Sequence, residues 1–366
     1  MIYTYEEAKP YLGIRGRTVE DPQRGGLYMN WSTAGVELKF RGTKLGVIVE
    51  SIGNKNMMDP AAPEEFPVLA LIDEEDNIVV RRLVKSDERE VTLFEAAPGE
   101  EAERLVKVIK LTEDSRGKIR LIGIDVEGEL LPLPEREKKP MIEIVGDSIT
   151  CGYGNEVTDP ALHFDPETEN GWIAYGPAAA REIGADWSIV AASGIAVAGW
   201  AGAPAGFGPP HFAMEEQYAY TDRAIADLRE LPNPEWDFAA HKSDVVVINL
   251  GTNDASQIAF SRNREEAEQR FREHYAAFIR EVRRLNGPDT YILCTLGPMD
   301  YYLLDEIRDL VSAYQQETGD EKISFYKYAH VNMMFEGFGA DMHPSAKTHA
   351  RMGRELAAVL KKILNL

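Results

Sequence analysis

The first 135 residues alternate apolar and polar positions in short runs, a pattern that predicts β-strands with one buried face. The run Val36-Glu37-Leu38-Lys39-Phe40 shows this period of two most clearly. Turn sequences such as Arg41-Gly42-Thr43 separate the runs. Further strands are expected at residues 45–50, 68–72, 78–83, 91–94, 105–111 and 119–126. About seven short strands spaced roughly ten residues apart predict an all-β sandwich or jelly roll.

From residue 141 onward, the pattern changes to apolar runs, each followed by a loop and then by helical periodicity. Strands are expected at 141–145, 187–191, 245–250, 291–295 and 323–328, and helices at 171–183, 213–230, 263–285, 301–317 and 345–364. Strands that are apolar throughout are typical of a parallel sheet covered by helices on both faces. The pattern therefore predicts an α/β doubly wound, three-layer domain with a flavodoxin-like sheet.

Residues 131–140 separate the two patterns. This stretch contains three prolines and a dense run of charges, which favour a stiff, extended connector. We therefore expect a β-sandwich (jelly-roll) accessory domain at 1–135 and an α/β domain at 136–366. A chain of 366 residues with 44% apolar residues is long and apolar enough for two cores.

The composition excludes several classes of partner. A formal net charge of −21 disfavours nucleic acids and anionic membrane surfaces and leaves a neutral or cationic substrate. The start of the chain lacks the features of a secretory signal, and no segment is apolar enough to span a bilayer, so a cytoplasmic location is expected. Cys151 and Cys294 are expected to be reduced, and their spacing indicates no metal site. The sequence does not indicate an oligomeric state.

Four polar segments each follow an apolar run in the second half of the chain. They are Gly-Asp-Ser-Ile-Thr at 146–150, Ala-Ser-Gly at 192–194, Gly-Thr-Asn-Asp at 251–254 and Asp-Met-His-Pro at 341–344. Each alone is also a natural turn sequence, because Gly, Asp, Asn and Ser are common in turns. Open parallel sheets bind ligands beyond the carboxyl ends of their strands, so we expect the four segments to meet at one edge.

Together these segments can supply a nucleophile and its base. The hydroxyl of Ser148 needs a neighbouring base to remove its proton at neutral pH. Among seven histidines, His343 is the first candidate because it follows the last strand and shares an edge with Ser148, and His330 is the second. Asp341 can accept a hydrogen bond from the imidazole as the third catalytic group, or it can cap the final helix.

The same edge offers donors for an oxyanion and planes for a substrate. The N–H groups of Ser148 and Gly194 and the side-chain amide of Asn253 form a candidate three-point oxyanion hole. Aromatic side chains offer flat faces for stacking, and Tyr153 and Trp200 are the candidates for substrate binding. Signatures of nucleotide, zinc and calcium sites are missing from the sequence, so we predict no metal and no cofactor.

The four ordered segments resemble the blocks of the SGNH or GDSL hydrolase superfamily, with Ser148, Gly194, Asn253 and His343 in the matching positions. The continuation of Gly-Asp-Ser-Ile-Thr into Cys-Gly-Tyr-Gly at 151–154 is similar to carbohydrate esterase family 2. Members of that family also have an amino-terminal jelly roll. The resemblance implies deacetylation of plant oligo- or polysaccharides such as xylan or glucomannan, with a leaning toward the 6-hydroxyl of hexoses, and it makes 136–366 the catalytic domain.

Two positions depart from the pattern that the resemblance implies. The superfamily spaces its acid and base as Asp-x-x-His, whereas Asp341-Met342-His343 is one residue shorter. Relatives in the esterase family orient the histidine with a backbone carbonyl, so Asp341 can act through its main chain. Met342 stands where relatives often carry tryptophan.

Two other functions stay open on the sequence alone. The four blocks do not determine the ester, so a GDSL-type lipase or lysophospholipase is the alternative enzyme. A carbohydrate-binding protein with an inert hydrolase domain is the alternative outside enzymes, although all four predicted catalytic positions are occupied.

Overall fold

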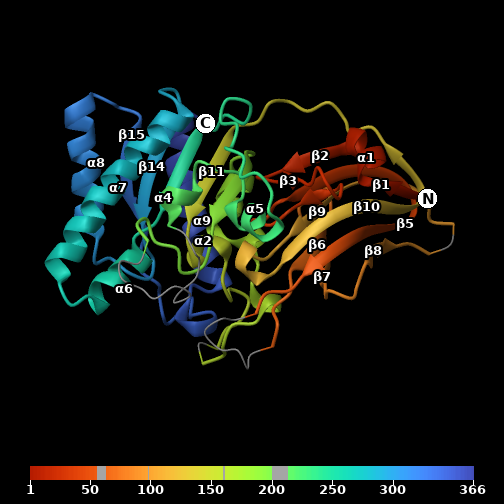
Figure 1. Ribbon diagram of the computed structural model, residues 1–366, viewed down its shortest axis with the longest axis horizontal. Coiled ribbons are helices and arrows are strands. Elements are labelled where there is room, and N and C mark those ends of the chain that lie inside the picture. Colours follow the sequence, from red (N-terminus) through yellow and green to blue (C-terminus); the bar gives the residue numbers. More distant parts are fainter. Residues whose placement is uncertain (56–62, 98, 160, 200–212) are drawn as a thin grey trace. The chain divides into compact units, whose positions relative to one another are not determined.

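The computed structural model describes residues 1–55, 63–97, 99–159, 161–199 and 213–366 (Figure 1). Contacts within the chain define two compact units. The first contains Met1–Lys138, Asp165–Glu167 and Asp222–Asn233, and the second contains Lys139–Phe164, Thr168–Thr221 and Pro234–Leu366. The division into domains at residues 135 and 136 stays a prediction. No helix among the described residues is long and apolar enough to cross a membrane.

The first unit is an antiparallel β domain, as the alternation of apolar and polar residues predicts. Its strands are β1 (Ile2–Thr4), β2 (Leu12–Arg15), β3 (Val19–Glu20), β4 (Leu27–Tyr28), β5 (Gly35–Ile52), β6 (Val68–Ile72), β7 (Ile78–Leu83), β8 (Glu90–Glu95), β9 (Ala102–Lys110) and β10 (Lys118–Leu131). A short helix, α1 (Tyr5–Ala8), follows β1. The long strand β5 pairs with β9 as far as Gly42 and with β8 from Lys44, so its neighbour changes at Thr43.

The expected turn at Arg41-Gly42-Thr43 is wrong, because β5 continues through it. Gly42 lies so close to β10 that a Cβ there would be 2.1 Å from the carbonyl oxygen of Glu127. The register between β5 and β10 shifts at Glu127 and Gly128. The glycine therefore permits a β-bulge and close strand contact, which is the other common use of glycine inside a strand.

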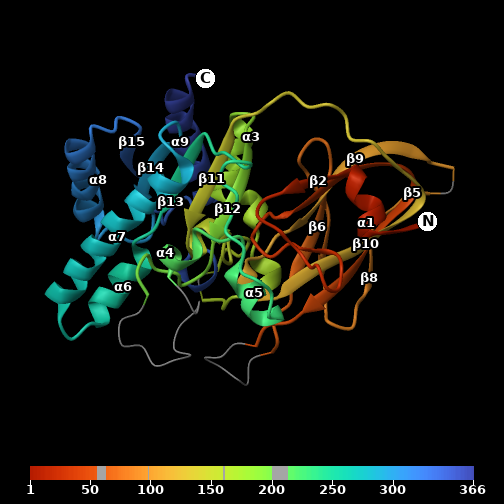
Figure 2. The ribbon, with the colours of Figure 1, turned by 45° about the horizontal axis from the view of Figure 1, so that its top comes forward.

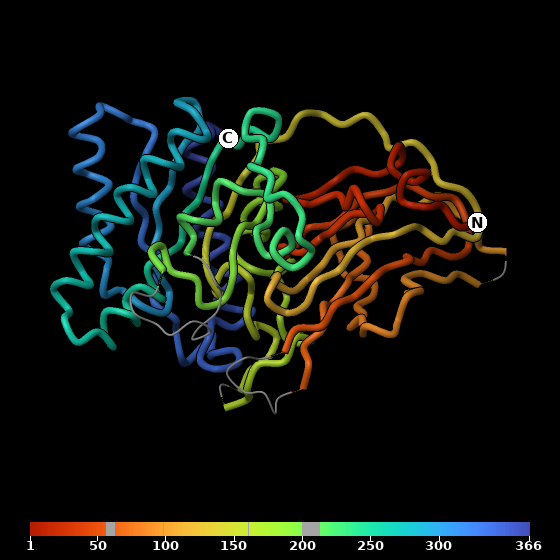
Figure 3. Tube along the Cα trace, in the orientation of Figure 1, coloured from red at the N-terminus to blue at the C-terminus, as the bar shows by residue number. Residues whose placement is uncertain are grey.

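The expected helix at 213–230 is also wrong, because two short helices, α4 (Met214–Gln217) and α5 (Arg223–Arg229), replace it. Asp222 interrupts the expected helix, because it is the N-cap of α5 and accepts a hydrogen bond from the N–H of Ile225. In Figure 3 the green segment that contains α5 lies against the red strands of the first unit. Asn30 donates to the Asp222 carboxylate at 2.6 Å, which fixes the start of α5 in that unit.

The second unit contains five parallel strands in the order β12-β11-β13-β14-β15. They are β11 (Met141–Gly146), β12 (Asp186–Ala191), β13 (Val245–Asn249), β14 (Tyr291–Leu296) and β15 (Ile323–Lys327). Helices cover both faces of this sheet, with α3 (Tyr175–Glu182) against α9 (Ala346–Leu364) and α7 (Arg264–Asn286) against α8 (Leu304–Thr318) (Figure 2). The predicted doubly wound fold is confirmed.

The helices begin where polar caps precede amphipathic runs. Ser345 caps α9 by accepting the N–H of Thr348, and Met352, Leu356 and Leu360 form a buried stripe at a spacing of four residues. Besides α1 in the first unit, two helices of the second unit were not predicted, namely α2 (Ser148–Cys151) and α6 (Thr252–Phe260). Both begin inside the polar segments that follow β11 and β13, where the residue types indicated turns.

Candidate active site

The ends of three neighbouring strands lie side by side at one edge of the parallel sheet. Gly146, the last residue of β11, pairs with Ala191 of β12 on one side and with Asn249 of β13 on the other. The chain order reverses here, because the strand that precedes β13 along the chain lies on the far side of β11. Such a switch point is the usual ligand site of open α/β sheets. The segments that carry Ser148, Gly194 and Asn253 leave the sheet at this point.

Ser148 is the first residue of α2, directly beyond β11. Asp147 caps this helix by accepting the N–H of Ile149 at 3.0 Å, and Gly152 ends it in the left-handed conformation at φ 80°. Ser148 is 8% exposed, and its Oγ lies 2.9 Å from Nε2 of His343. The structure therefore brings the predicted nucleophile and base into hydrogen-bonding contact.

His343 follows a tight turn in the 3₁₀ helix Ala340–Met342, just before α9. Asp341 and Met342 adopt left-handed conformations, with φ values of 47° and 64°. Neither residue is a glycine, and each such conformation costs about 1–3 kcal/mol, which is typical of functional sites. The turn places the carbonyl oxygen of Asp341 3.3 Å from Nδ1 of His343. Nδ1–H can therefore donate to this carbonyl, which leaves Nε2 free to accept the serine proton.

The carboxylate of Asp341 has other partners. The hydroxyl of Tyr153 and the N–H of Phe164 each donate to Oδ2 at 3.0 Å, and Nδ1 of His163 lies 3.1 Å from Oδ1. Partial burial alone raises the pKa of this carboxyl, but the hydrogen bonds outweigh burial and hold the pKa below its ordinary value. The alternative that Asp341 caps the final helix is wrong, because Ser345 caps α9. Of the two ways in which Asp341 could orient the histidine, the backbone carbonyl agrees with these contacts better than the carboxylate.

Asn253 connects the segments expected to form the oxyanion hole. Its Nδ2 donates to the carbonyl oxygen of Ile195 at 2.9 Å and lies 3.5 Å from the carboxylate of Asp147. One amide therefore bridges the turn that contains Gly194 and the residue before Ser148. Gly194 has φ 78°, a conformation in which a side chain is strained. The contact with Asp147 is at the outer limit of a hydrogen bond, so the second amide hydrogen of Asn253 is only weakly bound to the protein and could donate to a substrate oxygen.

The two residues expected to bind substrate have different outcomes. Tyr153 lies beside the base, with its ring centroid 4.2 Å from that of His343. Trp200 lies outside the described residues. The roles of both in substrate binding stay predictions.

Asp254 is a buried residue whose role the sequence did not reveal, although it directly follows Asn253. It is 4% exposed, and both of its carboxylate oxygens lie 3.2 Å from the N–H of Val197. Burial raises the pKa of this carboxyl to about 7, although backbone N–H groups bound to it oppose the shift. Asn253 and Asp254 thus attach the turn at 194–197 to the first turn of α6.

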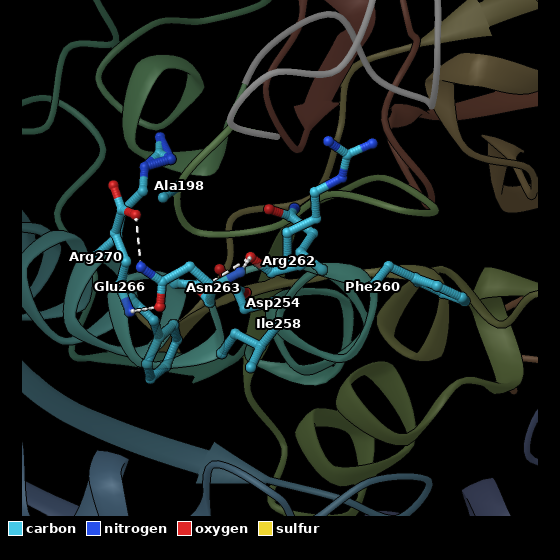
Figure 4. A pocket seen from close by; sticks show the side chains of 12 residues that line it. Ala198, Asp254, Ile258, Phe260, Arg262, Asn263, Glu266 and Arg270 are labelled. Atoms are coloured by element: carbon cyan, nitrogen blue, oxygen red, sulfur yellow. Dashed lines mark hydrogen bonds between the residues drawn. The ribbon is translucent and has the colours of Figure 1, made fainter.

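A cavity of about 370 Å³ lies at the far end of α6 (Figure 4). Asp254 and Ala198 contribute to its lining, and Phe260, Arg262 and Arg270 surround it. Neither Ser148 nor His343 lines it, so the bonded pair is not part of this cavity. In the part of the chain that the structure describes, no three His, Cys, Asp or Glu side chains are grouped as metal ligands.

The sequence profile of the GDSL-like lipase/acylhydrolase family matches residues 144–351, and that of the carbohydrate esterase 2 N-terminal domain matches residues 14–134. The chain belongs to carbohydrate esterase family 2 of the GDSL-like acylhydrolases. The recognition of this family from four short segments is confirmed. In this family 2 esterase, the first profile covers most of the second unit and the second profile covers most of the first unit.

Three known proteins illustrate the relationship. The chain is 34% identical to the cellulase/esterase CelE of Acetivibrio thermocellus over 99% of this chain, which corresponds to 40% of the length of that relative. It is 27% identical to an acetylxylan esterase/glucomannan deacetylase of Cellvibrio japonicus, over 94% of this chain and 89% of the relative. A family two carbohydrate esterase from Clostridium thermocellum, solved in complex with cellohexaose, superposes with a TM-score of 0.79 at 31% identity, covering 97% of this chain and 99% of that one.

Proposed function

We propose that this protein is a serine esterase that removes acetyl groups from plant-derived oligo- or polysaccharides. The observation that supports this proposal most directly is the 2.9 Å contact between Ser148 Oγ and His343 Nε2 at the switch point of the sheet. Family membership adds the type of substrate, because the similar proteins from Cellvibrio japonicus are named as acetylxylan esterases and glucomannan deacetylases.

The reaction proceeds in two acyl-transfer steps. Nε2 of His343 accepts the hydroxyl proton as Oγ of Ser148 attacks the acetyl carbonyl carbon, and the oxyanion forms facing Asn253 and the N–H groups of Gly194 and Ser148. His343 then gives its proton to the departing sugar oxygen, which leaves an acetyl-serine. A water molecule then loses a proton to His343 and attacks the same carbon. The bond between this carbon and Oγ of Ser148 breaks, Oγ takes the proton back from His343, and acetate leaves. The carbonyl of Asp341 holds the imidazole in the tautomer that both steps need.

The substrate assignment goes further than the chemistry of the site. The preferred substrates are oligosaccharides of the xylan or glucomannan type that are acetylated on hexose or xylose hydroxyls. Among these positions, the 6-hydroxyl of hexoses is preferred. The formal charge of −21 is compatible with neutral glycans of this kind and disfavours anionic lipid surfaces. No metal or cofactor takes part in the proposed steps.

Replacing the nucleophile tests the mechanism. Ser148→Ala is expected to lower kcat/KM on 4-nitrophenyl acetate by at least about a thousandfold, because only the oxyanion donors and binding remain. Acetate release from acetylated xylo- and manno-oligosaccharides should fall by the same factor. If the variant keeps most of its activity, Ser148 is not the nucleophile.

The length of the acyl chain separates the esterase from the lipase alternative. Rates on 4-nitrophenyl esters that fall from acetyl to butyryl to octanoyl support a small acyl pocket, and the reverse order supports a lipid substrate. Binding of acetylated oligosaccharides with no acetate release by the wild-type protein would instead support the non-catalytic alternative.

A further inference from the structure

Tyr153 lies between two glycines that fix its position beside the base. Gly152 and Gly154 are both left-handed, with φ values of 80° and 53°. A Cβ on Gly154 would be 2.3 Å from Cβ of Ala340, and the carbonyl oxygen of Gly154 accepts the N–H of Ala340 at 3.0 Å. The loop that carries Tyr153 is therefore held against the same 3₁₀ helix that orients His343.

Two rings pack on the ring of Tyr153. The imidazole of His343 has its centroid 4.2 Å away at an interplanar angle of 30°, and the ring of Phe164 lies 4.2 Å away at 32°. These distances and small tilts mean that the rings meet through their faces. At the edge of the ring, the hydroxyl of Tyr153 is held by Oδ2 of Asp341.

A Ser-His-Asp triad uses its carboxylate to stabilise the imidazolium that forms when the histidine takes the serine proton. In this protein the carboxylate of Asp341 bonds to Tyr153, His163 and Phe164, and Nδ1 of His343 faces a neutral carbonyl. The face of an aromatic ring carries partial negative charge and attracts a cation placed over it. Tyr153 presents such a face to the imidazole.

We propose that Tyr153 is a positioning residue whose ring face stabilises protonated His343 and fixes the orientation of its imidazole, a task that a carboxylate performs in a triad. This inference rests on the proposed function, since it assumes that His343 is the base. Asp341 then acts twice, through its carbonyl on Nδ1 and through its carboxylate on the hydroxyl of Tyr153.

Several titratable groups surround His343. Asp341 lies on the 3₁₀ helix, and its hydrogen bonds outweigh partial burial and hold the pKa of its carboxyl below the ordinary value. His349 on α9 is fully buried, and burial, with the charge of His343, lowers its pKa to about 3, so it stays neutral. Asp147 lies on the α2 side, next to Ser148, and His163 is paired with Asp341. Since His163 is a second imidazole, the experiment below uses a His163→Gln background.

The test compares an aromatic with an aliphatic side chain at position 153. Tyr153→Leu is expected to lower the pKa of His343 by about half a unit, because a cation–π contact stabilises the charged form by about 0.5–1 kcal/mol. The same variant should lower kcat on 4-nitrophenyl acetate two- to fivefold, with KM little changed. Tyr153→Phe keeps the ring face, so it should leave this pKa unchanged and retain most of kcat. Tyr153→Met replaces the leucine variant if that variant does not fold.

The pKa of His343 is measured by NMR titration in a protein that carries both His163→Gln and Ser148→Ala, with the signal assigned by its loss in His343→Gln, whereas kcat is measured with Ser148 in place. This readout needs no turnover, so it tests the ring contact even if the proposed function fails. Phe164→Leu is the matched control, because it removes a ring that contacts Tyr153 and should leave the pKa of His343 in place. An unchanged pKa in Tyr153→Leu, a rise, or an equal shift in Tyr153→Phe would overturn the proposal.

Discussion

Two hydrogen bonds, one in each unit, join side chains that are almost two hundred residues apart in sequence. In the second unit His343 contacts Ser148 across 195 residues, and in the first unit Asn30 contacts Asp222 across 192 residues. The first contact brings the proposed base to the proposed nucleophile at the edge of a sheet, where Ser148 is still 8% exposed. In the contact between Asn30 and Asp222, Asp222 is 2% exposed and also caps α5, so its carboxylate has a structural role. Similar contacts thus serve chemistry in one unit and assembly in the other.

Asn253→Ala tests the chemical side of this comparison and has the largest expected effect. Loss of one oxyanion donor is expected to lower kcat on an acetyl ester by about a hundred- to a thousandfold. The stability should change much less, because Asn253 is half-buried at the sheet edge. Ser256→Ala, an exposed change on the same helix, is the control and should leave kcat unchanged. A loss of activity that merely follows unfolding in thermal melts would remove Asn253 from the oxyanion site.

Asp222→Ala tests the assembly side. The change removes the N-cap of α5 and leaves the amide of Asn30 buried without this acceptor, which should cost about 2 kcal/mol in the free energy of unfolding. Denaturant unfolding measures the loss. The folded variant should keep its kcat, and Asp227→Ala, an exposed carboxylate on α5, should change the stability by less than about 0.5 kcal/mol. A variant that is stable but inactive would contradict the distinction between the two contacts.

The sequence predicted the second unit better than the first for a physical reason. Buried parallel strands leave long apolar runs, and the polar residues beyond them mark the ligand edge, so Ser148, Gly194, Asn253 and His343 could be located without coordinates. Helix α5 belongs to the first unit, where Asn30 binds Asp222. These two residues lie far apart in sequence, so no local sequence pattern predicts their contact.

Details of the site itself were also beyond the sequence. Two consecutive left-handed residues, Asp341 and Met342, turn the carboxylate away from the histidine. These residue types do not by themselves predict a left-handed conformation. The same turn precedes His343, whose imidazole packs against the ring of Tyr153. The spacing of Asp341 and His343 indicated only that this chain is one residue shorter here than the usual Asp-x-x-His pattern.

Asp254 shares features with both kinds of contact. It is buried like Asp222, and it binds the turn beside the proposed oxyanion site. Burial raises the pKa of its carboxyl to about 7, whereas an unfolded chain has an ordinary aspartate near 3.9. Between these values the folded state holds a proton that the unfolded state has lost, so this group adds stability as the pH falls from 8 toward 4. The gain is about 1.4 kcal/mol for each pH unit below 7.

Asp254→Asn should remove that gain. Unfolding free energies at pH values of about 8 and 6 would be compared, and the wild-type protein should gain about 1 kcal/mol more than the variant on acidification. The contributions of other titrating groups to the pH dependence are the same in both proteins, so they cancel in this difference. Equal responses in both proteins would show that the carboxyl of Asp254 does not titrate between pH 6 and 8 in the folded state.

Asp341→Asn has the smallest expected effect. It tests the distinction between catalytic and structural contacts within one residue, because Asp341 makes contacts of both kinds. Its carbonyl faces the base, whereas its carboxylate joins Tyr153, His163 and Phe164, as a structural aspartate does. Changing the corresponding aspartate of a Ser-His-Asp triad to asparagine lowers kcat by about 10⁴. Here the carbonyl survives the change and an amide oxygen can still accept the N–H of Phe164, so kcat/KM should fall less than about tenfold. A drop near the triad value, measured on a protein with an unchanged melting temperature, would assign the carboxylate to catalysis and erase the distinction between the two kinds of contact at this residue.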